Sequence, residues 1–373
     1  MSINRPWPAP YTVVPGPDPS RTMPADTQPT PDFTPRALGF RPRPEWAPHA
    51  RTWMAWPAHP ETFVGTVKEA QEAFARVANT LAEFEPVSMV LGPEQEAVAR
   101  RLLSSEIEQL PWGIDDAWMR DIAPSFLVNA EGEVAGTDWV FNDYGNKDGR
   151  NIEGYGQDAA TAERILHHRG MRRFASDLVC EGGTLVCDGD GTLITNASVV
   201  LNPNRNPDLS RGDAEKLLRE YLNVERIIWF EDGLLDDDTD GHTDNLAAFA
   251  GPGRVLLLSE DNPDDSNYAA LRAARQVLEQ STDARGRPFE IIELPQPAER
   301  HNGELRYALS YANFCLANGA VLVPAFDDPR RDTYARDLIA EQFPGRKAIS
   351  LPSIAIIAGG GSLHCITHEE PAA

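Results

Sequence analysis

Residues 253–262 read GRVLLLSEDN, a glycine followed by an apolar run that ends in acidic and amide side chains. An apolar run of this length between turn-forming residues is typical of a buried β-strand. The pattern recurs in GEVAGTDWVFND from Gly132, GTLITNASVVLN from Gly191 and GAVLVPAFDD from Gly319. A fifth run, TWMAWPAHP from Thr52, fits without the leading glycine. The sequence therefore predicts five buried strands of one kind.

A segment with the 3.6-residue periodicity of an amphipathic helix follows each of these strands. The predicted helices cover residues 66–84, 157–168, 210–222, 266–280 and 333–343. Ser210 is a good N-cap for the third of them, and Ser266 and Asp332 carry side chains suited to the same role. Strands and helices thus alternate along the chain, which indicates an α/β protein.

The leading glycines lie about 60 residues apart, which indicates a repeated unit. Alternating strands and helices would ordinarily suggest one doubly wound sheet. Five similar units in one chain favour instead a five-bladed α/β propeller of ββαβ-type repeats around a central channel. In that fold, the residues that enter the channel come from turns and strand ends in different blades.

The N-terminal segment differs from the rest of the chain. Residues 1–40 are dense in proline and show no periodicity. We expect a disordered tail, or one that clings to the surface, because such a composition cannot bury enough apolar surface to fold. Residues 41–373 are then a single catalytic domain.

The charge balance excludes some partners. Asp and Glu number 57 against 34 Lys and Arg, so the formal net charge is −23. A broad basic surface for nucleic acid or an anionic membrane is therefore not expected. An acidic protein can attract a cationic small molecule, although solubility alone is the ordinary explanation of such a charge.

The cysteines and the apolar segments bear on the compartment. Four cysteines in 373 residues do not make a disulfide framework. Neither a secretory signal nor an apolar run of 18 residues is found in the sequence. We therefore expect a cytoplasmic protein.

Four short motifs carry side chains that could take part in catalysis or ligand binding. They are WMRDIAPSF, CEGGTLVC, DDDTDGHTDN and, at residues 359–371, GGGSLHCITHEEP. Each has an ordinary structural explanation when taken alone: an ion pair, a turn, a solvated acidic loop or a buried thiol. The candidate residues in them are Trp118, Asp121, Glu181, Asp238, His242, Asp244 and Cys365.

The combination is more informative than any one motif. A cysteine becomes a nucleophile when its thiolate is stabilised, and a histidine supplies acid and base steps near neutral pH. Glycines before Cys365 allow the backbone to bend sharply. His242 and Asp244 are two residues apart, so both face one side of an extended segment. Several carboxylates beside a thiol suit a ligand with many N–H donors, and guanidinium is the natural candidate.

At this point the chain resembles the agmatine deiminases, which are guanidine-modifying enzymes of the pentein superfamily related to the bacterial peptidylarginine deiminases. The resemblance rests on WMRD, EGG, LNPNRNP, DTDGHTDN and GGGSLHCITHEEP, which occur in this order. It also includes PEWAPHARTWMAWP from Pro44 and SYANFCLANGAVLVPAFDDP from Ser310, and so extends over residues 40–371. It implies the five-bladed propeller and the conversion of agmatine and water to N-carbamoylputrescine and ammonia, without metal or cofactor.

The resemblance also implies catalytic roles. Cys365 matches the nucleophile, which attacks the guanidinium carbon and forms a covalent thiouronium. His242 matches the general acid and base, and Glu181 matches the acidic residue that supports the histidine.

The resemblance assigns the remaining candidates to the substrate. Asp121 and Asp244 match the carboxylates that grip the guanidinium nitrogens, and Trp118 and Asp238 match residues that line the substrate pocket. The neighbours of Cys365, namely His364, His368, Glu369 and Glu370, are expected to be rim or packing residues.

Five positions near these motifs depart from the pattern usual in the agmatine deiminases. Tyr144 stands where tryptophan is usual, Asn146 where glycine is usual and Ser362 where asparagine is usual. Ala123 stands where glycine is usual, and Thr243 where isoleucine is common. The changes at Tyr144, Asn146 and Ser362 leave open which tail the guanidine substrate carries.

Other functions remain open on the sequence alone. They are a deiminase for arginine or peptidyl-arginine, an amidinotransferase of the same fold, and a non-catalytic binder of cationic ligands. A papain-like protease would need its cysteine before its histidine, and a zinc site would need ligands less closely bunched than those around Cys365. The resemblance also suggests that copies of the chain associate as homo-oligomers.

Overall fold

The structure is a computed structural model that describes residues 33–63, 66–146, 154–303 and 305–373. Most of the expected tail, residues 1–32, lies outside the described residues. The last part of it packs on the helix α8 (Arg211–Leu222), where the amide of Arg36 donates to the carbonyl of Glu220 at 3.1 Å. Phe40 is buried there, with its ring 5.5 Å from that of Phe174.

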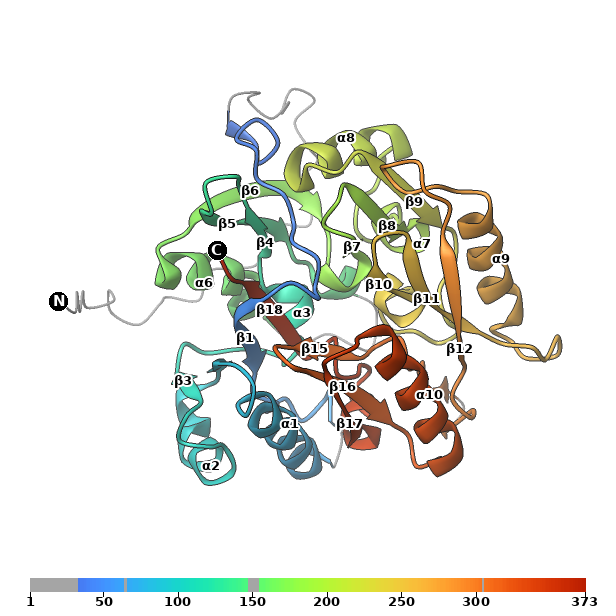
Figure 1. The fold of residues 1–373 in the computed structure, drawn as a ribbon. Helices are drawn as coiled ribbons and strands as arrows, with labels where there is room; N and C mark the ends of the chain where they lie inside the picture. The colour runs from blue at the N-terminus through green and yellow to red at the C-terminus, as the bar shows by residue number, and fades with distance from the viewer. Residues whose placement is uncertain (1–32, 64–65, 147–153, 304) are drawn as a thin grey trace.

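Five small sheets share one connectivity (Figure 1). In each sheet two strands pair antiparallel, and a further strand joins in parallel after a crossover through a helix. The first sheet has one more parallel strand at its edge. In the order in which neighbours pair, the first sheet contains β18 (Thr367–Pro371), β1 (His49–Ala55), β2 (Val87–Val90) and β3 (Glu108–Leu110), the second β4 (Ser125–Val128), β5 (Val134–Val140) and β6 (Arg172–Val179), and the third β7 (Val186–Cys187), β8 (Thr192–Asn196) and β9 (Arg226–Phe230). In the same order, the fourth contains β10 (Ala247–Gly251), β11 (Arg254–Ser259) and β12 (Glu290–Pro295), and the fifth β15 (Cys315–Ala317), β16 (Ala320–Ala325) and β17 (Lys347–Pro352). In addition, β13 (His301–Asn302) and β14 (Leu305–Arg306) form a hairpin. The predicted mixed α/β fold is confirmed.

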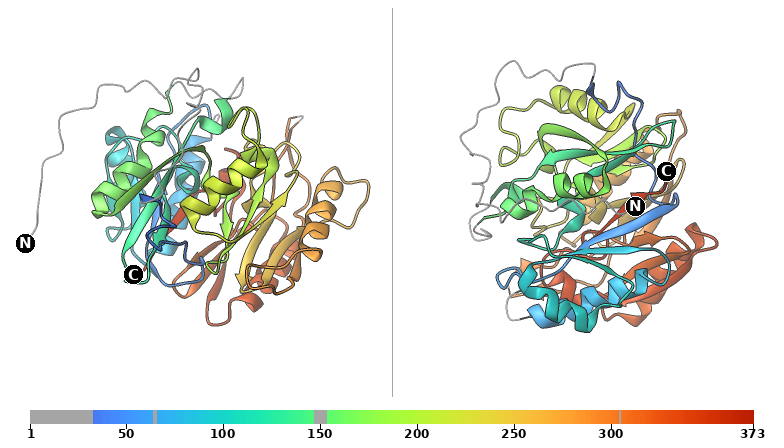
Figure 2. Two further views of the ribbon diagram at one scale, coloured as in Figure 1. Left: turned by 90° about the horizontal axis from the view of Figure 1, so that it is seen from above. Right: turned by 90° about the vertical axis from the view of Figure 1, so that its left-hand side faces the viewer.

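The last strand of the chain completes the first sheet. β18 pairs antiparallel with β1, with Trp53 opposite His368 and Met54 opposite Thr367. The C-terminus therefore lies beside the N-terminal sheet, as the label C and the strand β1 show in Figure 1. In the right-hand view of Figure 2 the C-terminus again lies beside the blue strand β1. This pairing places Cys365 beside the start of the folded chain, because the cysteine precedes β18 by two residues.

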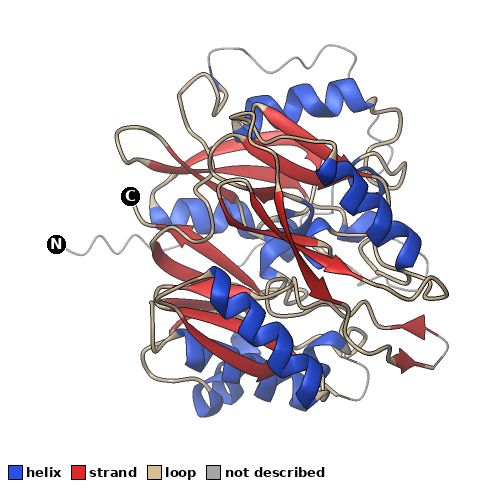
Figure 3. Ribbon diagram, turned by 45° about the vertical axis from the view of Figure 1, so that its right-hand side comes forward, coloured by secondary structure: helices blue, strands red, loops and turns tan. Residues whose placement is uncertain are grey.

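The crossover helices lie toward the outside of the molecule and the strands toward its middle (Figures 1 and 3). They are α1 (Val67–Leu81), α6 (Thr161–Arg169), α8, α9 (Tyr268–Glu279) and α10 (Pro329–Gln342). The shorter helical segments are α2 (Glu96–Leu102), α3 (Met119–Ile122), α4 (Asp143–Asn146), α5 (Gly156–Ala159), α7 (Ala197–Val200) and α11 (Ile354–Ile357), with the 3₁₀ turns η2 (Pro93–Gln95), η3 (Gly182–Thr184) and η4 (Thr243–Asn245). In the part of the chain that the structure describes, no helix is long and apolar enough to span a membrane.

One of the three predicted N-caps is confirmed, and the other two helices start elsewhere. The hydroxyl of Ser210 caps α8 and accepts from the amide of Asp213 at 3.2 Å, as expected. The N-cap of α9 is Asn267 and not Ser266. Helix α10 begins four residues before the predicted start because Asp328 caps it, and Asp332 lies inside the helix.

The strand predicted from Gly191 is also shorter than its apolar run. Its second half, Ala197–Val200, forms α7. The side chain of Asn196 accepts from the amide of Ser198 at 3.2 Å and so starts a helical turn at the strand end. The loop that follows, residues 201–209, carries Arg205, whose side chain is fully buried.

Helix α1 shows how the crossover helices are held. Ala70, Phe74 and Ala78, four residues apart, are fully buried in a core cluster with Phe63, whereas Arg76 is exposed. Residues at this spacing lie on one face of a helix, and that face covers the first sheet. Phe74 meets Phe63 edge to face, with ring centroids 6.0 Å apart.

Replacing Phe74 by alanine is expected to lower the free energy of unfolding by about 3–5 kcal/mol, because the cavity cannot close. Arg76→Ala on the exposed face should change it by no more than about 0.5 kcal/mol. Urea unfolding followed by circular dichroism compares the two. Equal effects would contradict the role of this face in the core.

Candidate active site

Five of the predicted residues form one buried cluster: Asp121, Glu181, His242, Asp244 and Cys365. They come from α3, from the segment before η3, from the start and middle of η4, and from the turn before β18. A methyl group placed on Gly183 would touch three of them at once. The structure therefore assembles residues that lie up to 244 positions apart in the sequence.

The thiol of Cys365 lies between an amide and a carboxylate. Asn313 Nδ2 donates to the Cys365 Sγ at 3.2 Å, and Asp244 Oδ2 lies 3.8 Å from it. Burial, and then the negative charges of Asp244 and Asp121, raise the pKa of the thiol well above its usual value. In this environment Cys365 is a protonated thiol at neutral pH, and a nearby positive charge would be needed to produce the thiolate.

The ring of His242 lies between two carboxylates. Its Nδ1 is 3.7 Å from Asp121 Oδ1, and its Nε2 is 3.7 Å from Glu181 Oε2. Neither ring nitrogen forms a hydrogen bond with another described residue. Burial favours the neutral ring, but the charges of Asp121 and Glu181 raise the pKa of His242 to about 9. The ring is thus an imidazolium with both protons available.

Glu181 is held by a buried arginine. Arg205 Nε donates to Glu181 Oε1 at 2.8 Å, and Arg205 Nη2 donates to the carbonyl of Thr239 at 3.0 Å. Burial would raise the pKa of Glu181, but the charge of Arg205 holds it below its usual value. Glu181 therefore stays ionised beside His242. Arg205 is the arginine of LNPNRNP, which the sequence prediction gave no role.

Asp121 is held by a backbone amide and a phenol. The Gly183 amide donates to Asp121 Oδ1 at 2.8 Å, and the Tyr144 hydroxyl donates to Oδ2 at 2.9 Å. Burial raises the pKa of Asp121 to about 6, and the positive charge of His242 opposes this rise. Among the carboxylates of the cluster, Asp121 is the one whose charge the protein compensates least.

Asp244 belongs to a chain of ionisable groups that continues past the cysteine. His364 Nδ1 lies 2.8 Å from Asp244 Oδ2, and His364 Nε2 lies 2.9 Å from Glu45 Oε1. Burial lowers the pKa of His364, but Glu45 and Asp244 together raise it to about 9. Burial would raise the pKa of Asp244, but His364 holds it below its usual value. The other oxygen of Asp244, Oδ1, has no hydrogen-bond partner among the described residues.

The sequence predicts His364 at the rim or in packing, and not among the catalysts. The structure adds that this histidine is buried and contacts Asp244 directly. Its neighbours are closer to that expectation. Glu369 pairs with Arg120 at 2.7 Å, and His368 Nε2 lies 2.9 Å from the carbonyl of Pro124. Glu370 is buried and accepts from Trp53 Nε1 at 3.0 Å.

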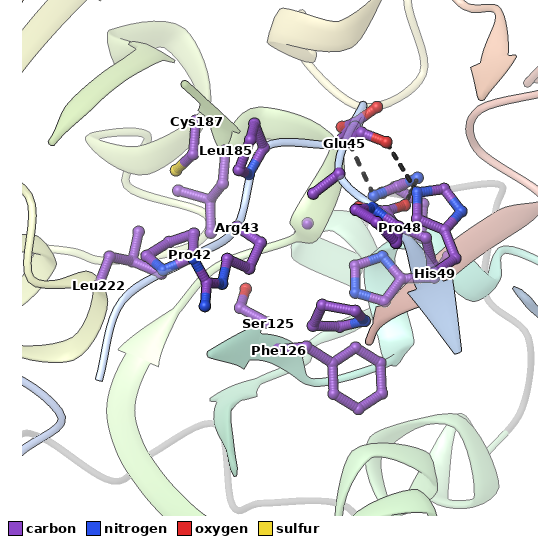
Figure 4. A pocket seen from close by; sticks show the side chains of 17 residues that line it. Pro42, Arg43, Glu45, Pro48, His49, Ser125, Phe126, Leu185, Cys187 and Leu222 are labelled. Carbon is purple, nitrogen blue, oxygen red and sulfur yellow. Dashed lines mark hydrogen bonds and ion pairs between the residues drawn. The ribbon is translucent and has the colours of Figure 1, made fainter. Parts of the chain in front are cut away.

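A pocket lies beside this ionisable chain (Figure 4). Glu45, His49 and Phe126 are among the side chains around it, and Arg120, next to Asp121, reaches it as well. An adjoining pocket is lined in part by Glu45, Asp244 and His364. Cys365 and His242 are deeper, with exposed fractions of 6% and 1%.

Two glycines allow the cluster to form. A Cβ at Gly183 would lie 2.4 Å from His242 Nδ1 and 3.0 Å from Asp121 Oδ1. A Cβ at Gly361 would lie 2.6 Å from the ring of Trp118 and 3.0 Å from Cys365 Cβ. Both contacts are closer than atoms tolerate, so EGG and GGG are required by close approach at these positions.

The two predicted pocket residues differ in position. Trp118 is buried beside the glycine turn, donates to Asp116 Oδ2 at 2.9 Å, and packs on Phe63. Asp238 is half-buried in the loop before η4 and takes no part in the contacts described above. The structure thus brings Trp118 to the cysteine, whereas Asp238 is more exposed than the five residues of the cluster.

The main residue that sequence reasoning missed is Asn313. It is fully buried, and its Oδ1 accepts from the amide of His364 at 3.0 Å while its Nδ2 contacts the sulfur of Cys365. The signal was present, because an asparagine in the apolar run YANFCLANG must find partners when it is buried. Periodicity cannot show that the partner is a cysteine 52 residues away.

The cluster suits a small cation more than a metal ion. Among the described residues, no group of three or more His, Cys, Asp and Glu side chains has the geometry to hold a metal. A guanidinium could place its N–H groups on Asp121 and on the free oxygen of Asp244, with its central carbon toward the sulfur. His242 would then lie within reach of a departing nitrogen.

Comparison with known proteins gives one consistent result. Residues 41–371 match the family described as Porphyromonas-type peptidyl-arginine deiminase. The agmatine deiminase of Ectopseudomonas mendocina (strain ymp) is 41% identical over 359 residues, which cover 91% of this chain and 97% of that protein. The agmatine deiminase of Pseudomonas aeruginosa (strain LESB58) is 41% identical over 362 residues, or 92% and 98%.

The fold agrees with the sequence. The solved structure of the agmatine deiminase of Enterococcus faecalis superposes with a TM-score of 0.85 at 34% identity, and the match covers 91% of this chain and 98% of that chain. A family match over nearly the whole folded chain, together with relatives of this identity and coverage, is decisive. The chain belongs to the Porphyromonas-type peptidyl-arginine deiminase family.

Proposed function

We propose that the protein is a hydrolase that deiminates agmatine, converting agmatine and water to N-carbamoylputrescine and ammonia. The observation that carries the proposal is the buried cluster in which the thiol of Cys365 and the imidazolium of His242 share one site with Asp121 and Asp244. The curated relatives that are 41% identical over nine-tenths of the chain are agmatine deiminases, which supports the choice of substrate.

Substrate binding supplies the charge that the thiol lacks. The guanidinium is a delocalised cation that keeps its proton in proteins. Gripped by Asp121 and Asp244, it lies against Cys365 and lowers the pKa of the thiol, whose proton leaves to solvent. The thiolate then attacks the guanidinium carbon and forms a neutral tetrahedral adduct.

His242 carries out the proton transfers that follow. It gives a proton to the departing nitrogen, ammonia leaves, and a cationic thiouronium remains on Cys365. The neutral ring then takes a proton from water, whose hydroxyl adds to the thiouronium carbon. The second adduct collapses to the ureido product and the thiol. A well-placed acid and base contributes about 10²–10⁴-fold to such a reaction.

We also propose that residues 41–373 form one catalytic domain with the architecture of a five-bladed propeller, preceded by a proline-rich tail at residues 1–40. The five sheets with one connectivity support this proposal. The proposed catalytic residues lie at strand ends and turns of different sheets, as expected for residues around a central channel. All four cysteines are free thiols, which is consistent with a cytoplasmic enzyme.

Arginine or peptidyl-arginine is the second candidate substrate, and the family description favours it. Free arginine carries a carboxylate that needs a cation in the pocket. The two buried arginines nearest the cluster are already paired, Arg120 with Glu369 at 2.7 Å and Arg205 with Glu181 at 2.8 Å. Agmatine has no carboxylate and is therefore the better match to these surroundings.

Ammonia release tests the proposed reaction. The purified protein is expected to release ammonia from agmatine faster than from arginine, from guanidinoalkylamines of other lengths or from a blocked arginine peptide. Cys365→Ala should abolish the release, because the covalent intermediate cannot form. If none of these compounds yields ammonia, the deiminase function is rejected in favour of an amidinotransferase or a non-catalytic binder of cations.

The pH profile tests the assigned protonation states. The reactive form has Cys365 as the thiolate and His242 as the imidazolium. It therefore carries one proton fewer than the form in which both groups are protonated. Both are protonated below about pH 9, because the pKa of His242 is about 9 and that of the thiol is higher. Hence kcat/KM for agmatine should rise about tenfold per pH unit from pH 7 toward pH 9. An optimum near pH 6 would show that these states are wrong.

Gly183→Ala tests whether the close approach of the Gly183 backbone to His242 and Asp121 is needed for activity. Its methyl group would displace His242 or Asp121, and a displacement of about 1 Å can cost about 100-fold in rate. Gly212→Ala, in the first turn of α8, is the control, because a Cβ there meets only the hydroxyl of Ser210, at 3.9 Å. Initial rates of ammonia release with agmatine compare the two. Similar rates for both variants would mean that the cluster tolerates displacement.

A further inference from the structure

Tyr144 is tied to the proposed guanidinium-binding carboxylate. Its side chain is buried, and its hydroxyl donates to Asp121 Oδ2 at 2.9 Å. The opposite oxygen of Asp121 accepts from the amide of Gly183. The ring of Tyr144 packs on Phe141 edge to face at 5.4 Å and lies 6.0 Å from the ring of His242.

The backbone around Tyr144 is held in an uncommon conformation. Four consecutive residues have positive φ: Asp143 at 54°, Tyr144 at 53°, Gly145 at 86° and Asn146 at 49°. Bulky L-residues rarely adopt this region, and such conformations persist only where their surroundings hold them.

This left-handed turn is fixed from two sides. Asn142 Oδ1 accepts from the amide of Gly145 at 2.9 Å, and Asn142 Nδ2 donates to the carbonyl of Asn204 at 2.9 Å. Asn204 Oδ1 in turn accepts from Arg205 Nη1 at 2.9 Å, and Arg205 holds Glu181. The same hydrogen-bond network therefore positions both Tyr144, the partner of Asp121, and Arg205, the partner of Glu181. Asp121 and Glu181 are the two carboxylates that flank His242.

The hydrogen bond from Tyr144 to Asp121 restrains a carboxylate that would otherwise be free to turn toward His242. Asp121 Oδ1 lies 3.7 Å from an imidazolium nitrogen that has no hydrogen-bond partner among the described residues. A freely rotating carboxylate would close this gap and turn the 3.7 Å ion pair into a direct hydrogen bond with His242. Both groups would then be unavailable to the substrate. The phenol and the amide of Gly183 together hold Asp121 away from the ring.

We propose that Tyr144 is a positioning residue, whose hydroxyl fixes the carboxylate of Asp121 in the orientation that receives the guanidinium and keeps it from a direct hydrogen bond with His242. This inference rests on the proposed function and deepens it. It concerns a position at which this chain departs from the related pattern, where tryptophan is usual.

Other ionisable groups also act on Asp121, and the test must separate them from Tyr144. The charges of Glu181, His242 and Asp244 act on Asp121, and Asp121 in turn raises the pKa of the thiols of Cys180 and Cys365. Arg120 is its neighbour on α3, and Asp116 acts on Tyr144. A change of tyrosine to phenylalanine alters none of these groups and removes one O–H donor.

The experiment measures agmatine binding in the Cys365→Ala background, so that catalysis does not enter. Calorimetric dissociation constants from pH 5 to 8 are compared with and without Tyr144→Phe. Losing a donor to the ionised carboxylate favours its protonated form, so the acid midpoint of binding should rise by about one pH unit. Affinity at pH 6 should fall about fivefold, because the ionised fraction of Asp121 falls from about one half to about one tenth. Tyr155→Phe is the control, because Tyr155 packs on the same Phe141, with ring centroids 6.1 Å apart.

An unchanged midpoint in the Tyr144→Phe variant, or an equal shift in the Tyr155→Phe variant, would overturn the inference. If the phenylalanine variant does not fold, Tyr144→Leu is measured in its place, with the same shift expected. Absence of agmatine binding at every pH would overturn it as well. Binding without ammonia release by the unmodified protein would instead reject only the deiminase, and the shift of the midpoint would still decide the role of Tyr144.

Discussion

The burial of several carboxylates around one thiol is the constraint on which the rest of the site depends. Asp121, Glu181 and Asp244 are each at most 5% exposed. Removing a carboxylate from water costs several kcal/mol unless charge and hydrogen bonds compensate. Arg205 supplies that compensation for Glu181, and His364 supplies it for Asp244. The buried arginine and the second histidine are therefore as necessary to the site as the groups that would perform the chemistry.

The compensation is uneven, and this unevenness points to a cationic ligand. The pKa values of Glu181 and Asp244 are held below their usual range, whereas burial raises the pKa of Asp121 to about 6. Asp121 receives two neutral donors and a histidine that stays 3.7 Å away. A guanidinium would supply the missing charge and would also stabilise the thiolate of Cys365. Substrate binding and activation of the nucleophile are then one electrostatic event.

The backbone makes this crowding possible. Gly183 and Gly361 remove the side-chain atoms that would collide with His242 and Trp118. The pairing of β18 with β1 fixes Cys365 against the first sheet, and the amide of Arg120 donates to the carbonyl of Cys365 at 3.1 Å. Short segments at strand ends thus converge from four parts of the chain, and the repeated sheets give each of them a rigid base.

The sequence by itself determined one strand of each sheet and the crossover helix that follows it, because periodicity and turn residues are local features of the chain. Its short motifs, through their resemblance to known deiminases, also identified the five residues of the buried cluster. Tertiary structure alone decided which groups become partners: Asn313 with Cys365, His364 with Asp244, Arg205 with Glu181 and Tyr144 with Asp121. Two element bounds also differ from the prediction: the end of the strand predicted from Gly191 is the helix α7, and α10 begins earlier than predicted. The physical reason is that a buried polar group must find its partner wherever the fold brings one, and no local pattern records that distance along the chain.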